Sequence, residues 1–550
     1  DYEDPHVVRS GFLMLAVSEL GTIGILVAFL LLYQAAGSFG FGALRTVVPA
    51  LSLPLRSTIF LFAFFGFGAK AGVLPLQLWL PEAHPAAPSH ISALLSAVII
   101  KLGIYGMLRF LFDFLGGPAL APAWWGLVIL SVGSVTALIG ILYAVVQHDL
   151  KRVLAYSSIE NIGIILAGLG AALTFRAYHL TALAAIAAIV TLYHILNHAV
   201  YKGLLFLGAG SIQHATGTRD LAKLGGLLRL MPWTGLFFIV AALAISAVPP
   251  FNGYISEWML LETLLQSFAI PDTLTKVVMA ISGALLALTA GIAVTAFVRA
   301  TGVSLLALPR SKEAASAHES PISMRVAMGF LAFLCLALGV LPTFVIPVLD
   351  RVTTPMFGQS VLNQVVPPLF TDHPGAYQLL VTIGGGLFRG WFPVNGLVVI
   401  PSPAFSTIDS PSYLFLAELL LIGLVLLTLR LIRPLGSRRT GRVWAGGIPR
   451  FEASMTYSSL AYSNPIRIIF NALFRSRIRS ESPAAAGSRE GRITYQQEIP
   501  PLFERPLYQP LLRLWGGLTR RARVIQSGNI NQYVAYIFVI VLIVLLLRAI

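Results

Sequence analysis

Three titratable side chains recur every four residues in the segment LYHILNHAVYKGLLF: His194, His198 and Lys202. Four residues turn a helix by about 400°, so the three groups drift by only about 80° and rise by roughly 12 Å. Single waters can bridge such gaps, and a proton relay is the favoured interpretation. A metal site and histidines packed in a core remain open. Against a metal, the segment has no HExxH glutamate and Lys202 would repel a cation.

Two lysines lie within long apolar runs, Lys70 in FFGFGAKAGVLPLQLW and Lys101 in SALLSAVIIKLGIYG. An ionisable side chain inside a membrane costs several kcal/mol unless it is paired or faces a wet cavity. Both lysines are therefore candidates for proton transfer. A permanent structural ion pair is the alternative for each.

An acid and a helix break follow in AISAVPPFNGYISEWMLLE, which contains Glu257. Pro249 and Pro250 remove two backbone donors, so the sequence predicts a helix broken in mid-membrane. The span of the first lysine is likewise predicted to break, at Gly72 and Pro75. Paired broken helices in two halves are typical of transporters built from inverted repeats, with ion sites at the breaks.

Other acids and histidines are possible groups for proton transfer or proton entry. They are Glu19, Glu82, His84, His90, Asp149 and Glu160. The Pro-rich connection WLPEAHPAAPSH, which holds the second to the fourth of them, is either a proton entrance or a solvated loop. Asp149 opens DLKRVLAYSSIENIG, where it can simply anchor a helix end, whereas Glu160 lies deeper in the same helix and is expected to be buried.

The elements that position these groups are membrane helices. The chain is 57% hydrophobic and 11% charged, with a mean hydropathy of +0.81, whereas soluble domains carry about 25% charged residues. Apolar runs of membrane-spanning length recur about eleven times. We expect spans near 10–33, 57–80, 90–112, 123–146, 153–174, 179–210, 233–264, 275–308, 323–349, 412–432 and 530–549. The fold class is an all-α polytopic membrane protein.

The net charge of +15 reflects topology rather than nucleic-acid binding. About nine Lys and Arg residues lie in the short connections on the side of the N-terminal end, and about seventeen more in the long segment before the last span. About eight lie on the opposite side. By the positive-inside rule the basic side is cytoplasmic, and we expect a multi-pass protein of a prokaryotic cytoplasmic membrane.

Redox and phosphate chemistry within this chain are disfavoured. A single cysteine, Cys335, excludes disulfides, Cys-ligated zinc and iron–sulfur clusters. P-loop, Rossmann, CxxCH and GxSxG motifs are absent from any supporting context. We expect no cofactor and no metal in this chain.

Four parts are expected along the chain. They are a transmembrane core at 1–310, further helices at 311–432 with an external Pro/Gly-rich segment at 350–411, a basic amphipathic lateral segment at 433–529 and a final helix at 530–550. Within them, AYQLLVTIGGGLFRGWFPVNG is interpreted as interfacial or re-entrant. SLAYSNPIRIIFNALFRSR and PLYQPLLRLWGGLTRRARVIQSG predict surface-lying amphipathic helices, joined by a flexible linker, SRIRSESPAAAGSREGR. The opening Asp-Tyr-Glu-Asp, without Met, suggests that a portion precedes it.

Four motifs resemble one family: KAGVLPLQLWLPEAHPAAPSHISALLSAVIIKLGIYG, DLKRVLAYSSIENIG, LYHILNHAVYKGLLFLGAG and SAVPPFNGYISEW. It is the proton-conducting antiporter-type family, which comprises the large membrane subunits of respiratory complex I, the Mrp-type cation/proton antiporters and the membrane subunits of energy-converting hydrogenases. SSIENIG, HATGTRDLAKLGGL and the C-terminal IQSGNINQYVAYIFVIVL are most similar to the formate hydrogenlyase and hydrogenase-4 branch.

The resemblance implies inverted five-helix repeats with broken helices, a central hydrophilic axis, and a lateral helix followed by a last transmembrane helix. Residues that match the family's proton path are Lys70, Lys101, His194, His198, Lys202 and Glu257. The family's partner for Lys70 is a glutamate on a helix just before the first span, which we expect to be missing here together with about four others. Glu19 stands where His or a small residue is expected.

The leading hypothesis is therefore a proton-translocating subunit of a multi-subunit redox complex, a group 4 [NiFe]-hydrogenase or formate hydrogenlyase. The resemblance implies antiporter-like and quinone-site-type membrane subunits, soluble hydrogenase-like and iron–sulfur subunits and lipids as partners. The NiFe centre and iron–sulfur clusters would belong to those partners. The alternatives are an Mrp-type sodium/proton antiporter and a membrane scaffold that conducts nothing.

Overall fold

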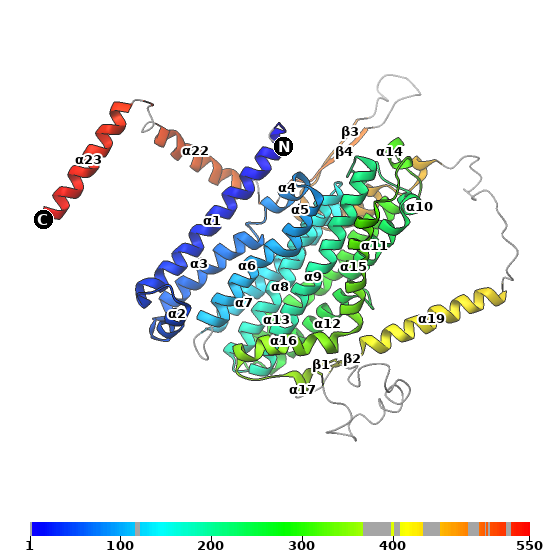
Figure 1. Cartoon of the computed structure of the whole chain (residues 1–550), viewed down its shortest axis with the longest axis horizontal. Coiled ribbons are helices and arrows are strands. Elements are labelled where there is room, and N and C mark those ends of the chain that lie inside the picture. Colours follow the sequence, from blue (N-terminus) through cyan, green and yellow to red (C-terminus); the bar gives the residue numbers. More distant parts are fainter. Residues whose placement is uncertain are drawn as a thin grey trace. The chain divides into compact units, whose positions relative to one another are not determined.

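The computed structural model describes residues 3–115, 121–366, 398–400, 407–432, 452–481, 494–500, 502–503, 507–523, 528 and 530–549. These residues form two compact units, Asp1–Asn464 and Pro465–Ile550. Helices dominate both units, and the long helices of the first lie side by side (Figure 1).

The first unit begins with helices that surround the predicted lysine sites. They are α1 (Pro5–Ala36), α2 (Phe41–Val47), α3 (Leu53–Ala71), α4 (Trp79–Ala86), α5 (Ser89–Leu94), a π-helical turn η2 (Leu95–Ile99), α6 (Ile100–Leu108) and a second π-helical turn η3 (Arg109–Phe114). Next come α7 (Ala123–Val146), α8 (Leu150–Ala177) and α9 (Thr181–Thr216), which form the centre of the bundle.

The remaining helices of this unit are α10 (Leu227–Leu230), α11 (Pro232–Ile245), α12 (Asn252–Leu265), α13 (Thr273–Leu305), α14 (Lys312–Ala315), α15 (Ile322–Val340), α16 (Pro342–Phe357), α17 (Leu362–Val365) and α19 (Pro411–Ile432). Of these helices, α11, α12, α15 and α16 pack against α9, and α13 packs against α7. Short 3₁₀ turns lie at Val48–Ala50, Gln266–Ala269 and Ala453–Met455. Two short strands, β1 (Val398–Ile400) and β2 (Thr407–Asp409), pair antiparallel.

Small residues bring α7 and α8 together at the centre of the bundle. A Cβ on Gly163 would stand only 2.3 Å from the backbone nitrogen of Ala137, and one on Gly140 only 2.5 Å from that of Glu160. Membrane helices commonly pack backbone to backbone through such residues. The membrane-crossing part of α8 is buried completely as a result, so its polar side chains face only other helices.

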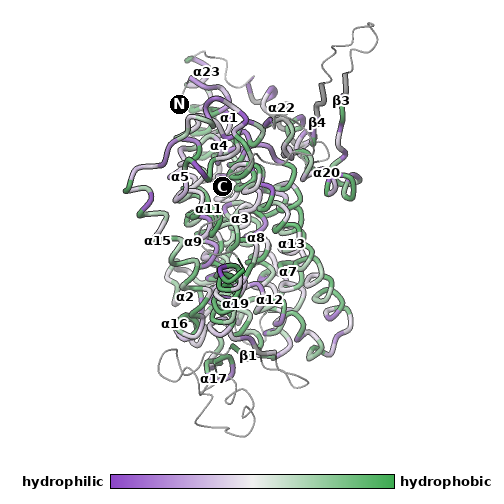
Figure 2. The backbone as a smooth tube through the Cα atoms, turned by 90° about the vertical axis from the view of Figure 1, so that its right-hand side faces the viewer, coloured by the Kyte–Doolittle hydropathy of each residue, from purple (hydrophilic) through white to green (hydrophobic). Residues whose placement is uncertain are grey.

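The membrane prediction is confirmed. Eight described helices are long and apolar enough to cross a membrane, and each overlaps one of the expected spans. Hydrophobic residues dominate the bundle helices along their length (Figure 2). The expected spans at 57–80 and 233–264 are each interrupted, as predicted, and form pairs of shorter helices, α3 with α4 and α11 with α12.

One expected span is wrong in its extent. The span predicted at 323–349 ends at Val340, and α16 starts anew at Pro342. Leu341 between them has φ −118° and ψ 47°, outside the helical region. Proline disfavours a helical conformation in the residue before it, which explains the break.

The expected external segment is partly helical, because α16 and α17 occupy its start and β1 pairs with β2 near its end. The interfacial or re-entrant run predicted at 376–396 lies outside the described residues. In the basic segment, α20 (Ser459–Ile469) with α21 (Asn471–Phe474), and α22 (Gln509–Arg523), form where amphipathic helices are predicted.

The predicted flexible linker is partly wrong. Its residues Arg477–Glu481 form strand β3, which pairs antiparallel with β4 (Thr494–Glu498). The register places Arg477 opposite Glu498, and opposite charges across a strand pair are stabilising. The rest of the linker lies outside the described residues. The second unit ends in α23 (Ile530–Ala549).

Candidate functional site

Helix α9 places His194, His198 and Lys202 in one buried file, here called the α9 file. Their exposed fractions are 1%, 0% and 0%. Lys202 Nζ donates to the Leu154 carbonyl at 2.9 Å and to Ser157 Oγ at 2.5 Å, both on α8. Within the described residues it forms no ion pair, so hydroxyl and carbonyl dipoles of α8 hold the ammonium group in place.

His194 connects the α9 file to two neighbouring helices. Its Nδ1 lies 3.0 Å from Ser256 Oγ on α12, and its Nε2 lies 3.2 Å from Asn161 Oδ1 on α8. Asn161 Oδ1 also accepts a 2.5 Å hydrogen bond from the Tyr201 hydroxyl. Asn161 is thus the hub of this network, and all of these side chains are buried.

The sequence interpretation missed Asn161, Ser157 and Ser256. A signal was available, because SSIENIG places several polar residues in an otherwise apolar span. Polar groups inside a membrane span require partners, so they mark its interior face.

His198 lies between the other two members of the α9 file and contacts the Tyr201 ring edge to face at 5.6 Å. Neither ring nitrogen bonds any of the described protein groups. Buried polar groups are nearly always paired, often with ordered water.

Two acids lie near the file, Glu160 on α8 and Glu257 on α12. Glu160 is 2% exposed, and Asn161 Nδ2 approaches its Oε2 at 3.5 Å. The charges of Lys202 and Glu257 both act on Glu160. Glu257 is half-buried and makes no hydrogen bond or ion pair with the described part of the chain.

Lys101 reaches the same centre from α6. Its Nζ donates to the Ser96 carbonyl at 2.5 Å, within the π-helical turn η2. Ser96 Oγ lies 2.8 Å from Ser158 Oγ on α8. A chain of hydroxyl and carbonyl contacts therefore joins α6 to the helix that binds Lys202.

Lys70 lies apart from this cluster. Its Nζ donates to Ser18 Oγ at 2.7 Å and Thr22 Oγ1 at 2.8 Å, both on α1. The lysine lines a pocket of about 380 Å³ that also contacts Ile99 and Leu102. Glu19 is exposed on another face of α1 and forms no contact with Lys70.

The first helix interruption follows Lys70 directly. Helix α3 ends at Ala71, and Gly72 takes φ +78°, a conformation that favours glycine. Helix α4 begins only at Trp79, whose indole donates to the Ala69 carbonyl at 3.1 Å. The interruption includes Pro75, as the sequence predicts.

The second interruption lies between Ile245 and Asn252 and contains Pro249 and Pro250. Asn197 Nδ2, on α9, donates to the Asn252 carbonyl at 2.7 Å and to Ser256 Oγ at 3.0 Å. Asn197 thereby holds the start of α12, close to Glu257, against α9.

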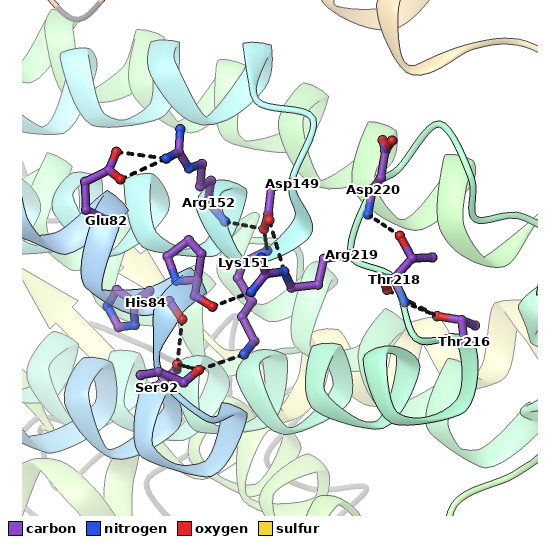
Figure 3. A network of polar contacts seen from close by, with 12 residues as sticks. Glu82, His84, Ser92, Asp149, Lys151, Arg152, Thr216, Thr218, Arg219 and Asp220 are labelled. Carbon is purple, nitrogen blue, oxygen red and sulfur yellow. Dashed lines mark hydrogen bonds and ion pairs between the residues drawn. The ribbon is translucent and has the colours of Figure 1, made fainter. Parts of the chain in front are cut away.

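Glu82 and Asp149, two of the residues proposed for proton entry, lie in a polar network at one end of the bundle (Figure 3). Arg152 Nη2 contacts both Glu82 carboxylate oxygens, at 2.8 and 3.0 Å. Asp149 accepts from the Lys151 and Arg152 backbone amides and pairs with Arg219 at 3.1 Å. Asp149 is therefore the N-cap of α8, as the anchoring interpretation predicts.

The two histidines of the Pro-rich connection occupy different places. His84 is fully buried, stacks on Phe206 at 4.6 Å, and bonds none of the described groups through its ring nitrogens. His90 is exposed and lines a pocket of about 880 Å³ together with Lys151 and His214. Lys151 is 1% exposed and donates to the Ala87 carbonyl at 2.9 Å, so it closes the inner end of this pocket.

A second residue that the sequence interpretation missed is Arg299, fully buried near the end of α13. Its Nε donates to the Ser459 carbonyl at 3.0 Å, and its Nη2 donates to Ser459 Oγ at 2.5 Å and to the Gln147 carbonyl. Ser459 Oγ also lies 3.4 Å from His148 Nδ1. Burial lowers the pKa of His148, and the Arg299 charge lowers it further.

The described part of the chain contains no group of three or more His, Cys, Asp or Glu side chains placed to hold a metal ion. The two histidines of the α9 file bond Ser256, Asn161 or no described group, and no carboxylate joins them. The geometry therefore favours a hydrogen-bonded relay over a metal centre.

Residues 1–285 match the family described as NADH:quinone oxidoreductase/Mrp antiporter, transmembrane. The chain belongs to this family. Hydrogenase-4 component B of Escherichia coli K12 is 37% identical over 99% of this chain and 76% of its own length. Formate hydrogenlyase subunit 3 of the same organism is 39% identical over 66% of this chain and 59% of its own length.

A solved structure supports the antiporter-type fold. The match in an archaeal membrane-bound sulfane sulfur reductase complex has a TM-score of 0.69 at 22% identity, covering 98% of this chain and 76% of that one. A chain of Thermus thermophilus respiratory complex I gives 0.53 at 22% identity over 64% and 70% of the two chains.

Proposed function

We propose that this chain is a proton-translocating membrane subunit of a multi-subunit redox complex of the group 4 [NiFe]-hydrogenase or formate hydrogenlyase type. The observation that carries the proposal is the buried polar network in the middle of an apolar bundle. It links Lys101 on α6, Lys202 on α9 and Ser256 on α12 through the polar face of α8. Burying so many ionisable groups is costly, and a scaffold would gain nothing from it.

Proton transfer in this arrangement uses groups that can both donate and accept. Ser157 accepts from Lys202, and its own hydroxyl donates to the Val153 carbonyl at 3.0 Å, so it can pass a proton by rotating. A neutral imidazole carries one donor and one acceptor nitrogen. Asn161 Oδ1 can only accept, so His194 Nε2 donates to it and Nδ1, which faces the Ser256 hydroxyl, is the nitrogen that can take up and release a proton. Glu257, next in chain to Ser256, would release the proton at the end of the path.

Redox partners would drive this path by changing the charge at one end of the bundle. A positive charge that appears near one lysine lowers the affinity of the next group for its proton, since Coulomb interactions are strong in a low-dielectric interior. Lys101 interacts electrostatically with both Lys202 and His198, so such a change would propagate along the file. The NiFe centre and iron–sulfur clusters would reside in soluble partner subunits, alongside antiporter-like and quinone-site-type membrane partners.

The test is proton uptake by proteoliposomes of the purified native complex during redox turnover. Lys202→Ala and Glu257→Gln are the variants, and Lys223→Ala and Glu313→Gln are matched controls because both side chains are exposed. We expect the proton gradient to fall at least about tenfold in the first pair, since general acid–base groups contribute 10²–10⁴-fold, and to persist in the controls. An unchanged proton gradient in both Lys202→Ala and Glu257→Gln would favour the scaffold that conducts nothing. A gradient that requires sodium would favour the sodium/proton antiporter.

A further inference from the structure

Arginines converge at one place on the side opposite the basic connections. Arg45 on α2, Arg109 in η3 and Arg176 in the last turn of α8 line a pocket of about 700 Å³ together with Asp113 and the end of α16. By the alternation of the spans expected from the sequence, few Lys and Arg residues are predicted on this side. The positive-inside rule accounts for basic residues on the other side, so it does not explain this gathering.

The pocket carries a surplus of positive charge. Asp113 is shared by two arginines, with Arg45 Nε and Nη2 at 2.5 and 3.1 Å from its two oxygens and Arg109 Nη2 at 2.8 Å. Arg176 forms no ion pair within the described residues. Three guanidinium groups therefore face one carboxylate, which leaves two positive charges for an anion to balance.

Arg176 is also held in a fixed orientation. Its guanidinium carbon lies 5.3 Å from the centre of the Phe357 ring and 5.9 Å from that of Phe112. Aromatic faces fix the guanidinium plane by cation–π attraction but accept no strong hydrogen bond. Arg176 Nη1 and Arg109 Nε are buried and bond none of the described groups. Both guanidinium groups line the pocket, and their forked N–H donors match the oxygens of a phosphate.

An apolar stripe leads away from the pocket. Tyr105, at its rim, is 59% exposed, and Leu102 and Val98 on the same face are 62% and 50% exposed. The spacing of three and four residues aligns the three side chains along one helix face. A ligand that fills both features must combine an anionic headgroup with a hydrocarbon chain.

We propose that this site binds an anionic phospholipid of the outer leaflet. Its phosphate contacts Arg109 and Arg176, and one acyl chain lies along Tyr105, Leu102 and Val98. Inorganic phosphate shares the headgroup chemistry but would leave the stripe unused. The proposal does not depend on proton translocation, because the arginines that bind the headgroup lie outside the α9 file and outside the pocket of Lys70, although Leu102 lines that pocket.

The test is native mass spectrometry of the purified complex titrated with phosphatidylglycerol, phosphatidylcholine or inorganic phosphate. Arg176→Gln is expected to weaken phosphatidylglycerol binding about tenfold, the effect of losing a hydrogen bond to a charged group. Arg351→Gln is the matched control, since Arg351 is exposed on α16 but does not line the pocket. We expect it to bind phosphatidylglycerol as the unmodified complex does.

Two further arms keep the outcome decisive. Arg176→Lys retains the charge but loses the forked geometry, so an intermediate loss is expected even if Arg176→Gln assembles poorly. Leu102→Asn should weaken phosphatidylglycerol binding without changing phosphate binding. Equal retention of phosphatidylglycerol by Arg176→Gln and Arg351→Gln overturns the proposal. So does displacement of the lipid by inorganic phosphate at comparable concentration, because the stripe would then contribute nothing.

Discussion

Lys70 and Lys202 occupy apolar helices of the same bundle, but the groups around them differ. Lys70 is half-buried, bonded to two hydroxyls of α1 and adjacent to a pocket. Lys202 is fully buried, bonded to a hydroxyl and a carbonyl of α8, and acted on by the charge of Glu160. The Lys202 region is thus a network of contacts enclosed within the protein, whereas the Lys70 side chain lines a pocket that other molecules can enter.

The two regions differ in how strongly the stability of the protein depends on the contacts of the buried lysine. In the closed network each side chain completes the bonding of another, so changing one member leaves several donors unpaired. Around Lys70 the hydroxyl groups have a local alternative, since Thr22 already donates to the Ser18 carbonyl at 3.1 Å. Stability should therefore depend strongly on the first arrangement and weakly on the second.

The largest effect is expected from Asn161→Leu. Loss of Asn161 Oδ1 leaves the Tyr201 hydroxyl and His194 Nε2 without their partner, at roughly 1–3 kcal/mol for each buried group. The free energy of unfolding should fall by that sum and the proton gradient at least about tenfold. Thermal unfolding in detergent and proteoliposome uptake measure the two, with Ser18→Ala as the control that loses about 1 kcal/mol at most. Equal destabilisation by both variants would remove the contrast between the regions.

Lys70→Met is expected to separate transport from stability. The proton gradient should fall at least about tenfold if Lys70 loads protons, while the free energy of unfolding changes by less than about 1 kcal/mol because the hydroxyls can rebond locally. The same two measurements apply. A variant that pumps normally would show that the Lys70 region lies off the proton path.

A smaller effect is expected from pH at the Arg299–Ser459 contact. The pKa of His148 is lowered in the folded protein, so the neutral form is favoured there and stability is full above the ordinary histidine pKa of about 6.5. Stability is lost as the pH falls below that value, because the folded protein binds the proton less readily. The protection factors of residues 452–464 in hydrogen exchange, which divide out the intrinsic pH dependence of amide exchange, should therefore fall between about pH 7 and pH 5.

His148→Gln is the control for that contact, since it cannot gain a charge. The protection factors of this variant should stay constant over the same pH range. If these protection factors fall as in the unmodified protein, another titrating group destabilises the Arg299 contact.

The smallest effect is expected from Arg152→Gln. The Glu82–Arg152 pair is about one third exposed at both side chains, and such pairs contribute about 0.2–1 kcal/mol. Proton uptake should stay within about twofold of normal, because the pair lies at the bundle end and serves to hold α4 against α8. A large loss of uptake would instead make Glu82 part of the entry path, and Glu82→Gln would then reproduce it.

The sequence alone predicts the class of fold, because apolar runs of membrane-crossing length have no other stable environment. It also predicts the file on α9, since helix periodicity places His194, His198 and Lys202 on one face whatever packs against them. The interruptions at Gly72 and at Pro249 follow from backbone chemistry that is local to those residues. The resemblance extends this to a family, which the comparisons confirm.

Which groups meet was decided only by tertiary packing. Nothing local to Asn161 indicates that its Oδ1 joins His194 and Tyr201, and nothing local to Arg299 indicates that it holds Ser459, because both contacts join residues far apart in the chain. The sequence alone does not decide whether Asp149 and Glu82 serve proton entry or hold the helix ends. Their ion pairs with Arg219 and Arg152 depend on how the helix ends pack. Helix periodicity acts within one helix, whereas hydrogen bonds between helices depend on rotations and depths set by the packing of the whole bundle.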